Sequence, residues 1–128
     1  MRVARRRRRP ETRMPTTLEI VDLAEGHSHV RIVGPLDLAG VGAIELRFTA
    51  STASRRTHAI VDMSQVPFMA SLGMGMLVQV ARTLAAGRHK VILLSPTEIV
   101  ATALRTARLD AVIPIAPDLE AAHGHLRT

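Results

Sequence analysis

The sequence predicts a single α/β domain whose sheet has four or five mostly parallel strands. Short apolar segments alternate with longer segments of helical periodicity between about residues 16 and 127. Repeated strand–helix units of this kind form a mostly parallel sheet with right-handed crossovers. A chain of 128 residues is long enough for one domain with a modest core. The sequence contains no repeat at a fixed period and predicts no second domain.

The first part of the domain predicts a hairpin followed by a helix. Residues 18–21 and 29–33 alternate apolar and polar side chains, which is typical of strands, and residues 25–27 (Glu-Gly-His) suit a hairpin turn. Residues 38–50 then show helical periodicity. Residues 51–57 are predicted to form a polar link to the next strand.

A buried strand and a long helix are predicted next. Residues 59–63 are apolar and bounded by polar residues, as in a buried strand. The following helix is predicted over residues 72–86, with small or apolar residues at helical spacing at Gly73, Leu77, Val80, Ala81 and Leu84. Residues 91–94 are a short apolar run that predicts another strand.

The remaining sequence predicts two helices and one strand. Residues 95–98 (Ser-Pro-Thr-Glu) resemble a capping box, with proline at the first helical position. We expect this helix to run to about Arg108. Its inward-facing residues are predicted to be Val100, Ala103, Leu104 and Ala107. A last strand over residues 112–115 and a helix from about Asp118 complete the pattern.

The composition predicts an aliphatic core and argues against several classes of protein. Hydrophobic residues make up 47% of the chain, but the aromatic residues are limited to Phe48 and Phe68. No aromatic surface for base stacking is therefore expected. The chain has no cysteine, which excludes disulfides and thiolate metal sites. No apolar run approaches the roughly 20 residues that span a bilayer, and the arginine-rich start lacks the apolar region of a signal peptide. We expect a cytoplasmic protein without a membrane span.

The net charge of +6 lies entirely in the first residues of the chain. Residues 1–13 contain seven arginines and one glutamate, whereas the basic and acidic side chains of residues 14–128 cancel. A run of arginines repels itself and has nothing to bury, so we predict a disordered basic tail over residues 1–15, followed by the domain over residues 16–127. The tail is either a solvated segment or an arm for weak contact with nucleic acid or acidic lipid. We expect no specific binding of nucleic acid.

The most informative segment is the predicted strand-to-helix turn that contains Ser71. Its hydroxyl is placed near the first turn of a helix, where backbone N–H groups are unpaired and the helix dipole favours negative charge. A phosphate on Ser71 would be tolerated there and would change the surrounding surface. The other role for Ser71 is an N-cap that accepts an N–H from the next turn. One serine can serve both roles.

The residues of this turn resemble those of the STAS domain of anti-sigma factor antagonists. That family typically has hydrophobic-Asp-Ser-Ser-Gly-Leu-Gly at this place. Here the corresponding residues, in order, are Met69, Ala70, Ser71, Leu72, Gly73, Met74 and Gly75. The chain keeps the first serine and both glycines, and it departs from the family at Ala70 and Leu72.

Other segments resemble the same family in the same order. Residues 34–37 (Gly-Pro-Leu-Asp) are similar to its Gly-x-Leu-Asp, and residues 61–66 (Val-Asp-Met-Ser-Gln-Val) are similar to its Asp-Leu-Ser-x-Val. The helix that ends at Ala86-Gly87 and the segment 104–113 also lie where the family has them. The resemblance covers roughly residues 17–126, and its specificity comes from the order and spacing of the motifs.

The resemblance implies a regulatory binding module that is not an enzyme and has no cofactor. It implies an anti-sigma factor antagonist that binds an anti-sigma factor serine kinase of the histidine-kinase-like ATPase type and is regulated by phosphorylation of Ser71. The expected partner-binding residues are Gly34, Leu36, Asp37, Ser71, Leu72, Gly73, Met74 and Gly75. The alternative is a non-switching STAS subunit of a lipid-transport or other membrane-transport assembly.

Two of these residues carry an open question. The family's aspartate at the position of Ala70 could order the turn or engage the kinase, and alanine does neither. The family places the aspartate at the position of Asp37 close to the phosphorylated turn, and Asp37 could instead cap the helix that starts near residue 38.

Enzymatic and metal-binding chemistries are weakly supported. The nucleophile elbow requires Gly-x-Ser-x-Gly, and Met69 takes the place of the first glycine. Gly73 and Gly75 hint at a phosphate loop, but the third glycine of the dinucleotide fingerprint is replaced by Val78. The two pairs of histidines, 27 with 29 and 123 with 125, have no accompanying set of carboxylates, so we expect surface histidines and no metal site.

Overall fold

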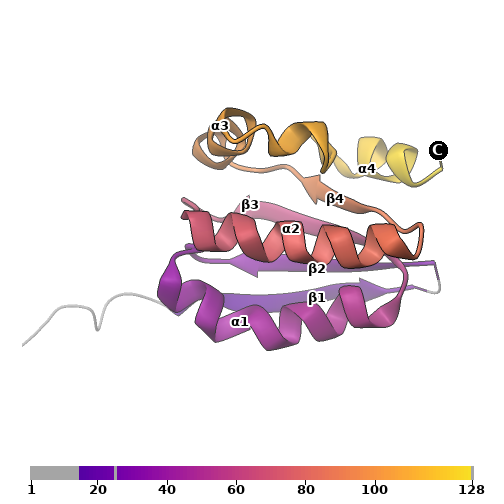
Figure 1. The fold of residues 1–128 in the computed structure, drawn as a ribbon, viewed down its shortest axis with the longest axis horizontal. Helices are drawn as coiled ribbons and strands as arrows, with labels where there is room; N and C mark the ends of the chain where they lie inside the picture. The colour runs from indigo at the N-terminus through magenta and orange to yellow at the C-terminus, as the bar shows by residue number, and fades with distance from the viewer. Residues whose placement is uncertain (1–14, 25, 128) are drawn as a thin grey trace, which may run out of the picture.

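A five-stranded sheet lies at the centre of the structure, in the order β1-β2-β3-β4-β5 (Figure 1). The computed structural model describes residues 15–24 and 26–127, so nearly all of the predicted basic tail lies outside the described residues. The strands are β1 (Thr17–Leu23), β2 (His27–Val33), β3 (His58–Gln65), β4 (Val91–Leu94) and β5 (Ile115–Ala116). β1 is antiparallel to β2, and the other neighbouring pairs are parallel. The predicted mostly parallel sheet is confirmed.

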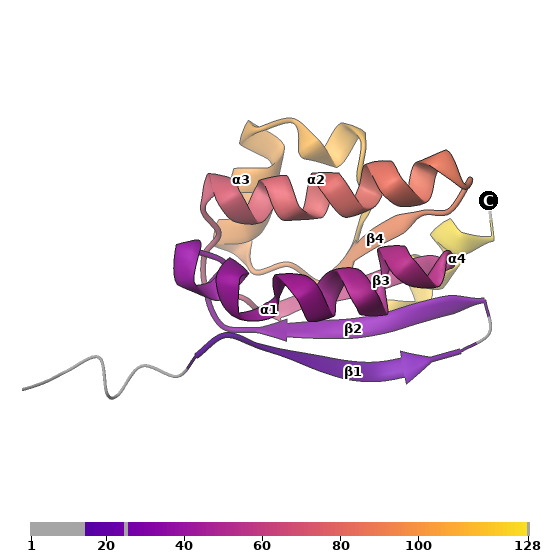
Figure 2. The same cartoon turned by 60° about the horizontal axis from the view of Figure 1, so that its bottom comes forward.

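Four helices cover the two faces of this sheet unequally (Figures 1 and 2). They are α1 (Leu38–Ser51), α2 (Ser71–Ala86), α3 (Glu98–Thr106) and α4 (Leu119–Leu126), with short 3-10 turns η2 (Ala53–Arg55) and η3 (Leu109–Ala111). The first three helices bury their apolar residues in one large core, which also contains Val30, Val61 and Leu93 of the sheet. α4 closes a smaller core on the opposite face, around Ile60 and Ile92.

The large core is aliphatic, as the composition predicts. Phe48 is the one aromatic residue in it and is fully buried, whereas Phe68 is 45% exposed. α2 contributes four large buried residues at helical spacing, namely Met76, Leu77, Val80 and Leu84. This stripe anchors α2 against the sheet and fixes the direction in which its first turn points.

The predicted capping box at residues 95–98 is wrong. α3 begins at Glu98 with Thr97 as its N-cap, and no side chain caps it. The Ser95 hydroxyl donates to the Pro117 carbonyl (2.9 Å), and the Thr97 hydroxyl donates to the Val66 carbonyl (2.8 Å). Both hydroxyls therefore join neighbouring loops. The helix also ends earlier than predicted, and Ala107 is exposed.

The last strand is shorter and later than predicted. Residues 109–111 form a 3-10 turn, Val112 is 70% exposed, and β5 contains only Ile115 and Ala116. Its register is fixed by backbone hydrogen bonds from Leu93 to Pro114 (2.9 Å) and from Ser95 to Ala116 (2.8 Å). Side-chain periodicity contains no information on this backbone pairing.

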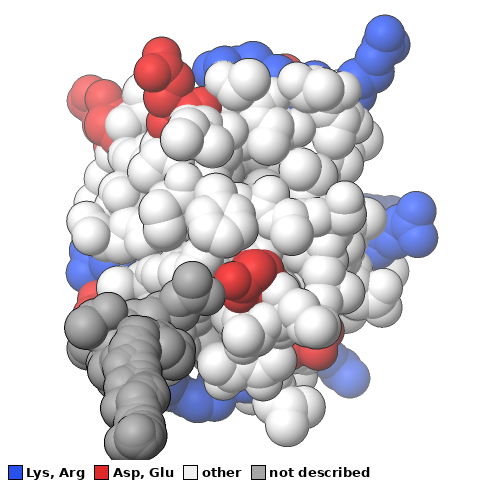
Figure 3. Space-filling view, turned by 90° about the vertical axis from the view of Figure 1, so that its left-hand side faces the viewer, with Lys and Arg blue, Asp and Glu red and all other residues white. Residues whose placement is uncertain are grey.

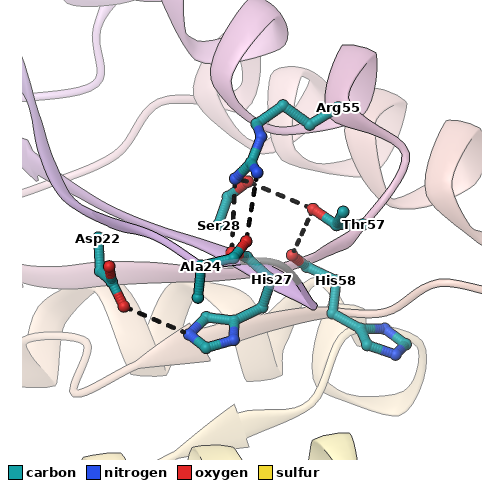
Figure 4. Close-up of polar contacts among 7 residues, drawn as sticks. All are labelled: Asp22, Ala24, His27, Ser28, Arg55, Thr57 and His58. Carbon is teal, nitrogen blue, oxygen red and sulfur yellow. Dashed lines mark hydrogen bonds and ion pairs between the residues drawn. The ribbon is translucent and has the colours of Figure 1, made fainter.

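The amino ends of β2 and β3 are joined by polar contacts (Figure 4). The Arg55 guanidinium donates to the Ser28 hydroxyl (2.7 Å) and to the carbonyls of Ala24 (3.2 Å) and His27 (3.4 Å). These bonds connect η2 to the β1–β2 hairpin. Ser28 is fully buried, so the guanidinium also satisfies a hydroxyl that has no access to water.

The histidines gather at this same end of the domain. His27 packs edge-on against His123 with 5.4 Å between ring centroids, and His58 packs against His89 at 5.3 Å. His29 is buried, with 8% exposure, and its Nε2 has no hydrogen-bond partner. The expectation of surface histidines is therefore wrong for His29. In the sheet, His29 of β2 lies beside Ile60 of β3.

Burial lowers the pKa of both His29 and His58. For His29, the charges of Arg31 and His27 add to the effect, and the carboxylates of Asp62 and Asp22 oppose it. For His58, the neighbours His89, Lys90 and His27 add to it. Each ring is therefore more easily kept neutral in the folded protein than in the unfolded chain.

The first turn of α2 lies directly against the loop that follows β2. A Cβ on Gly73 would lie 2.8 Å from the Cβ of Leu36, 2.8 Å from the Cγ of Met69 and 2.9 Å from the Leu36 carbonyl oxygen. A Cβ on Gly75 would meet nothing within 4 Å. Gly73 is thus needed for close packing within the domain, whereas Gly75 faces open space.

We expect acid to destabilise the domain. Because the folded-state pKa values of His29 and His58 are lowered, the unfolded chain binds more protons below the ordinary value of 6.5. Their contribution to stability is present above that pH and is lost as the pH falls below it. The melting temperature should drop between about pH 7.5 and pH 5.5, and His29→Leu should flatten this dependence. A wild-type melting temperature that is constant over this range would contradict the expectation.

We expect opposite effects from two alanine substitutions in the first two turns of α2. Gly73→Ala should destabilise the domain by about 1–3 kcal/mol, because the new methyl group overlaps Leu36 and Met69. Gly75→Ala is the matched control and should stabilise it by about 0.5–1 kcal/mol, through helix propensity alone. Urea unfolding of the two variants measures both. Equal effects of the two substitutions would show that the close contact at Gly73 is unimportant.

Candidate functional site

Two loops are joined by backbone hydrogen bonds at the carboxyl ends of β2 and β3. The Leu36 N–H donates to the Phe68 carbonyl (3.1 Å), and the Ala70 N–H donates to the Leu36 carbonyl (3.0 Å). Leu36 and Met69 therefore form an isolated parallel bridge. A further bond from Gly34 to Gln65 (3.0 Å) extends the pairing toward the sheet. The two segments that contain the eight expected partner-binding residues thus lie side by side.

Ser71 is the first residue of α2, and its side chain is exposed. The predicted N-cap role is wrong, because Ala70 occupies the N-cap position in an extended conformation and no side chain caps the helix. The Ala70 carbonyl accepts the first helical bonds, from Gly73 (2.9 Å) and Met74 (3.2 Å). The Ser71 hydroxyl makes no hydrogen bond within the described residues and is free to react or to bind.

Asp37 caps α1, as its position in the sequence allows. Its carboxylate accepts a hydrogen bond from the Gly40 N–H (2.8 Å). Since Leu36 is paired with the turn before α2, the cap of α1 and the start of α2 lie at the same end of the domain (Figures 1 and 2). Asp37 is half-buried, so part of the carboxylate faces solvent beside the Ser71 turn.

The expected partner-binding residues differ in how much they expose. Leu36 is fully buried and Gly73 is buried, so they support the surface from beneath. Leu72 is 48% exposed, and Gly75 is exposed. Met74 is half-buried and packs partly against the core.

Gly34 shapes the first loop. It has φ +117°, in the region that favours glycine, and a Cβ there would lie 2.8 Å from the Thr16 hydroxyl oxygen. The glycine therefore allows β1 and the loop after β2 to approach each other closely.

Sequence reasoning missed further apolar side chains at the starts of helices and in the turn. Leu38 is 77% exposed, Phe68 is 45% exposed and Ile99 is 66% exposed. α3 is connected to the same end through the hydrogen bond from Thr97 to Val66. The available signal was that each of these residues is large and apolar yet lies outside the buried periodic pattern. Monomeric proteins rarely collect such side chains without a use.

The surface around Ser71 is nearly free of charge, and we call it the Ser71 face: the loops 34–37 and 66–70 with the first turns of α1 and α2. Within residues 34–41 and 66–76, Asp37 is the one ionisable side chain. Figure 3 shows this end of the molecule as mostly uncharged, with an acidic group near its middle and further acidic and basic groups toward its edges. One added charge would therefore change the local potential strongly.

Arg31, Asp62 and Glu19 form a network of ion pairs on the opposite face of the sheet. The Arg31 guanidinium pairs with Asp62 (2.9 Å) and with Glu19 (3.1 Å). Burial alone would raise the pKa of Asp62, but hydrogen bonds from Ser64 and the Arg31 guanidinium outweigh it and lower the pKa. This aspartate of the 61–66 motif is thus engaged structurally. Within residues 15–24 and 26–127, no three His, Asp or Glu side chains are placed to hold a metal ion.

A surface cavity lies away from the Ser71 face. It has a volume of about 840 Å³ and lies between α3, η3 and α4. Ser95, Arg105, Asp110 and His125 contribute its polar lining. It contains none of the residues that the sequence singles out as partner-binding.

Solved structures of anti-sigma factor antagonists share this fold. One from Mycobacterium paratuberculosis has a TM-score of 0.73 at 24% identity, covering 88% of this chain and 95% of that chain. SpoIIAA in its unphosphorylated form has a TM-score of 0.70 at 22% identity, covering 87% and 96%. The phosphorylated form of SpoIIAA, from Bacillus, has a TM-score of 0.60 at 21% identity, covering 84% and 97%.

The same fold also occurs inside a membrane protein. The murine anion transporter Slc26a9, in its inward-facing state, has a TM-score of 0.67 at 18% identity over 88% of this chain and 22% of the transporter. For the present protein, no helix among the described residues is long and apolar enough to cross a membrane. No curated protein matches the sequence significantly.

The sequence matches the STAS domain family over residues 20–122, which is most of the chain. This range includes both loops of the Ser71 face and all five strands except the first residues of β1. The protein belongs to the STAS domain family.

Proposed function

We propose that the protein is an anti-sigma factor antagonist whose Ser71 face binds an anti-sigma factor serine kinase of the histidine-kinase-like ATPase type, with Ser71 as the phosphorylation site. One observation carries the proposal: the Ser71 hydroxyl is exposed and makes no hydrogen bond within the described residues. It lies at the start of a helix, on a face whose one ionisable side chain is Asp37. A kinase can reach such a hydroxyl without opening the domain.

The physical consequence of phosphorylation follows from the surroundings of Ser71. A phosphoserine carries about −1.5 to −2 charge at neutral pH. In the free domain, the unpaired N–H groups at the start of α2 face this charge, and the helix dipole favours it. Against an apolar partner surface, the same charge would have to lose its water without gaining a partner. Phosphorylation should therefore separate the two proteins.

One protein of known structure and one feature of the present protein support this proposal. SpoIIAA, which has the same fold, is named as an anti-sigma factor antagonist and has been solved in both phosphorylation states. The apolar side chains of Leu38, Phe68 and Leu72 on the Ser71 face suit a protein partner.

The second candidate function is that of a constitutive, non-switching STAS subunit of a lipid-transport or other membrane-transport assembly. The fold is present within the anion transporter Slc26a9, and Ala70 removes the carboxylate that the switching family has beside its serine. In that case, the apolar face would be a permanent contact surface and Ser71 would have no regulatory role.

The two functions are separated by substitutions at Ser71. We expect Ser71→Ala to bind a candidate kinase-like ATPase and to resist inactivation by that kinase with ATP. Ser71→Asp should raise the Kd by about 10–100-fold, because a charge must be desolvated at the interface. Calorimetric titration of both variants measures this. Equal binding by the two variants, with no phosphate detected on the wild type after incubation with kinase and ATP, would favour the non-switching subunit.

The role of the missing carboxylate can be tested in the same assay. If the alanine limits phosphotransfer, Ala70→Asp should increase the rate at which mass spectrometry detects phosphate on Ser71. The side chain at position 70 is exposed, so the substitution introduces no buried charge. An unchanged rate would show that other contacts direct the kinase.

The location of the interface is tested by a matched pair of leucines. Leu72→Glu places a charge on the Ser71 face and should weaken partner binding by about tenfold or more. Leu46→Glu is the control, since Leu46 is 88% exposed and lies about 12 Å along α1 from its first residue. The melting temperatures of both variants should stay close to that of the wild type. Equal loss of binding in the two would place the interface elsewhere.

A further inference from the structure

The chain enters the domain at the rim of the Ser71 face. Thr16, the residue before β1, is 6% exposed, and its hydroxyl donates to the Pro35 carbonyl (2.7 Å). Its backbone also lies against Gly34, where an added Cβ would be 2.9 Å from the Cα of Thr16. The start of β1 and the starts of α1 and α2 lie at the same end of the molecule in both ribbon views (Figures 1 and 2).

The path from this entry point to Ser71 is short. Thr16 contacts Pro35, Leu36 is paired with Met69, and Ser71 follows two residues later. The distance from Thr16 to Ser71 is roughly 20 Å at most. This estimate adds two distances between neighbouring strands to the length of a few extended residues.

The arginines before β1 are within covalent reach of Ser71. Arg13 lies two residues before Pro15, and Arg5 lies ten residues before it. At about 3.5 Å per residue, the fully extended chain carries these side chains to between roughly 7 and 35 Å from Pro15. The whole run from Arg5 to Arg9 can therefore be brought to the phosphorylatable hydroxyl without any change in the domain.

The Ser71 face itself offers no cation to a phosphate. Residues 34–41 and 66–76 contain no lysine or arginine. Elsewhere, the Arg31 side chain pairs with two carboxylates, and those of Arg47 and Arg55 are bonded to backbone carbonyls. In contrast, residues 1–13 contain seven arginines and one glutamate. The sequence thus concentrates its excess positive charge in the one segment that is attached beside Ser71.

We propose that the arginine-rich segment, residues 1–13, is an intramolecular ligand of phosphorylated Ser71. The inference rests on the proposed function in that it requires Ser71 to carry a phosphate. Guanidinium groups bind phosphate through paired, charge-assisted hydrogen bonds, and a phosphoserine opposite an arginine cluster can order a chain segment. Without the phosphate, the Asp37 carboxylate is the one ionisable side chain of the face, so the segment is attracted much less strongly. Phosphorylation would therefore both charge the face and cover it with a segment of the same chain.

The test uses the full chain with phosphoserine introduced at position 71 during synthesis, so that no kinase is needed. Phosphorus NMR then follows the second ionisation of the phosphate, whose ordinary pKa is about 6. The first comparison protein has Arg5→Gln through Arg9→Gln. The charge control has Arg82→Gln and Arg88→Gln, at exposed positions in the second half of α2 and just beyond its end. The site control carries phosphoserine at the exposed Ser54 in η2, with and without the five glutamines.

We expect the second pKa of phosphoserine 71 to be lower by about 0.5 in the full chain than in the chain with five glutamines, because nearby cations favour the dianion. The charge control should behave like the full chain, and phosphoserine 54 should be insensitive to the five substitutions. The difference should shrink at about 0.5 M salt, because salt screens the attraction between guanidinium and phosphate.

Two results would overturn the proposal. In the first, the titration curves of phosphoserine 71 coincide with and without the five arginines. In the second, the pKa of phosphoserine 54 responds to the five substitutions as strongly as that of phosphoserine 71. That result would show that the arginines attract any phosphate on the domain and do not bind specifically at the Ser71 face. Neither result depends on a kinase. Failure of this proposal is therefore distinct from failure of the proposed function, which is decided by partner binding and by phosphate transfer to the wild type.

Discussion

The backbone pairing between Leu36 and the turn before α2 is the contact on which the Ser71 face depends. Two hydrogen bonds, to Phe68 and from Ala70, hold the loop after β2 against the loop after β3. This contact places the cap of α1 beside the start of α2, although the two are more than thirty residues apart in sequence. Gly73 makes the contact close enough, because any side chain there would meet Leu36. The Ser71 side chain is exposed and makes none of the hydrogen bonds that join the two loops.

The sequence predicts this arrangement well wherever side-chain periodicity and local motifs decide the structure. The bounds of α1, α2 and β4 agree with the predictions to within one residue, and Asp37 caps α1 as its type and position suggest. The family resemblance supplied what periodicity cannot, namely the expectation that residues 34–37 and 71–75 lie close together.

The errors arise where long-range contacts compete with local signals. Ser95 and Thr97 have the spacing of a capping box, but their hydroxyls bond to Pro117 and Val66, which no local pattern reveals. Ser71 has the residue type of an N-cap, but Ala70 occupies the N-cap position. The N–H of Ala70 bonds to the Leu36 carbonyl in the neighbouring loop. The burial of His29 likewise depends on its neighbours across the sheet, since its own strand segment is polar.

The close packing at the start of α2 also constrains how a switch at Ser71 can operate. Because Gly73 and Leu36 are in contact, the first turn of α2 has little room to shift without separating the two loops. A phosphate on the exposed hydroxyl would touch none of these packed groups, so it has no contact through which to drive a rearrangement. Its effect must then come from charge at the surface. An uncharged face suits this mechanism, because the change in potential on phosphorylation is greatest where no other charge compensates it. In the proposed mechanism, an arginine-rich segment attached at the rim of the same face would respond to that charge alone, while the fold of the domain stays fixed.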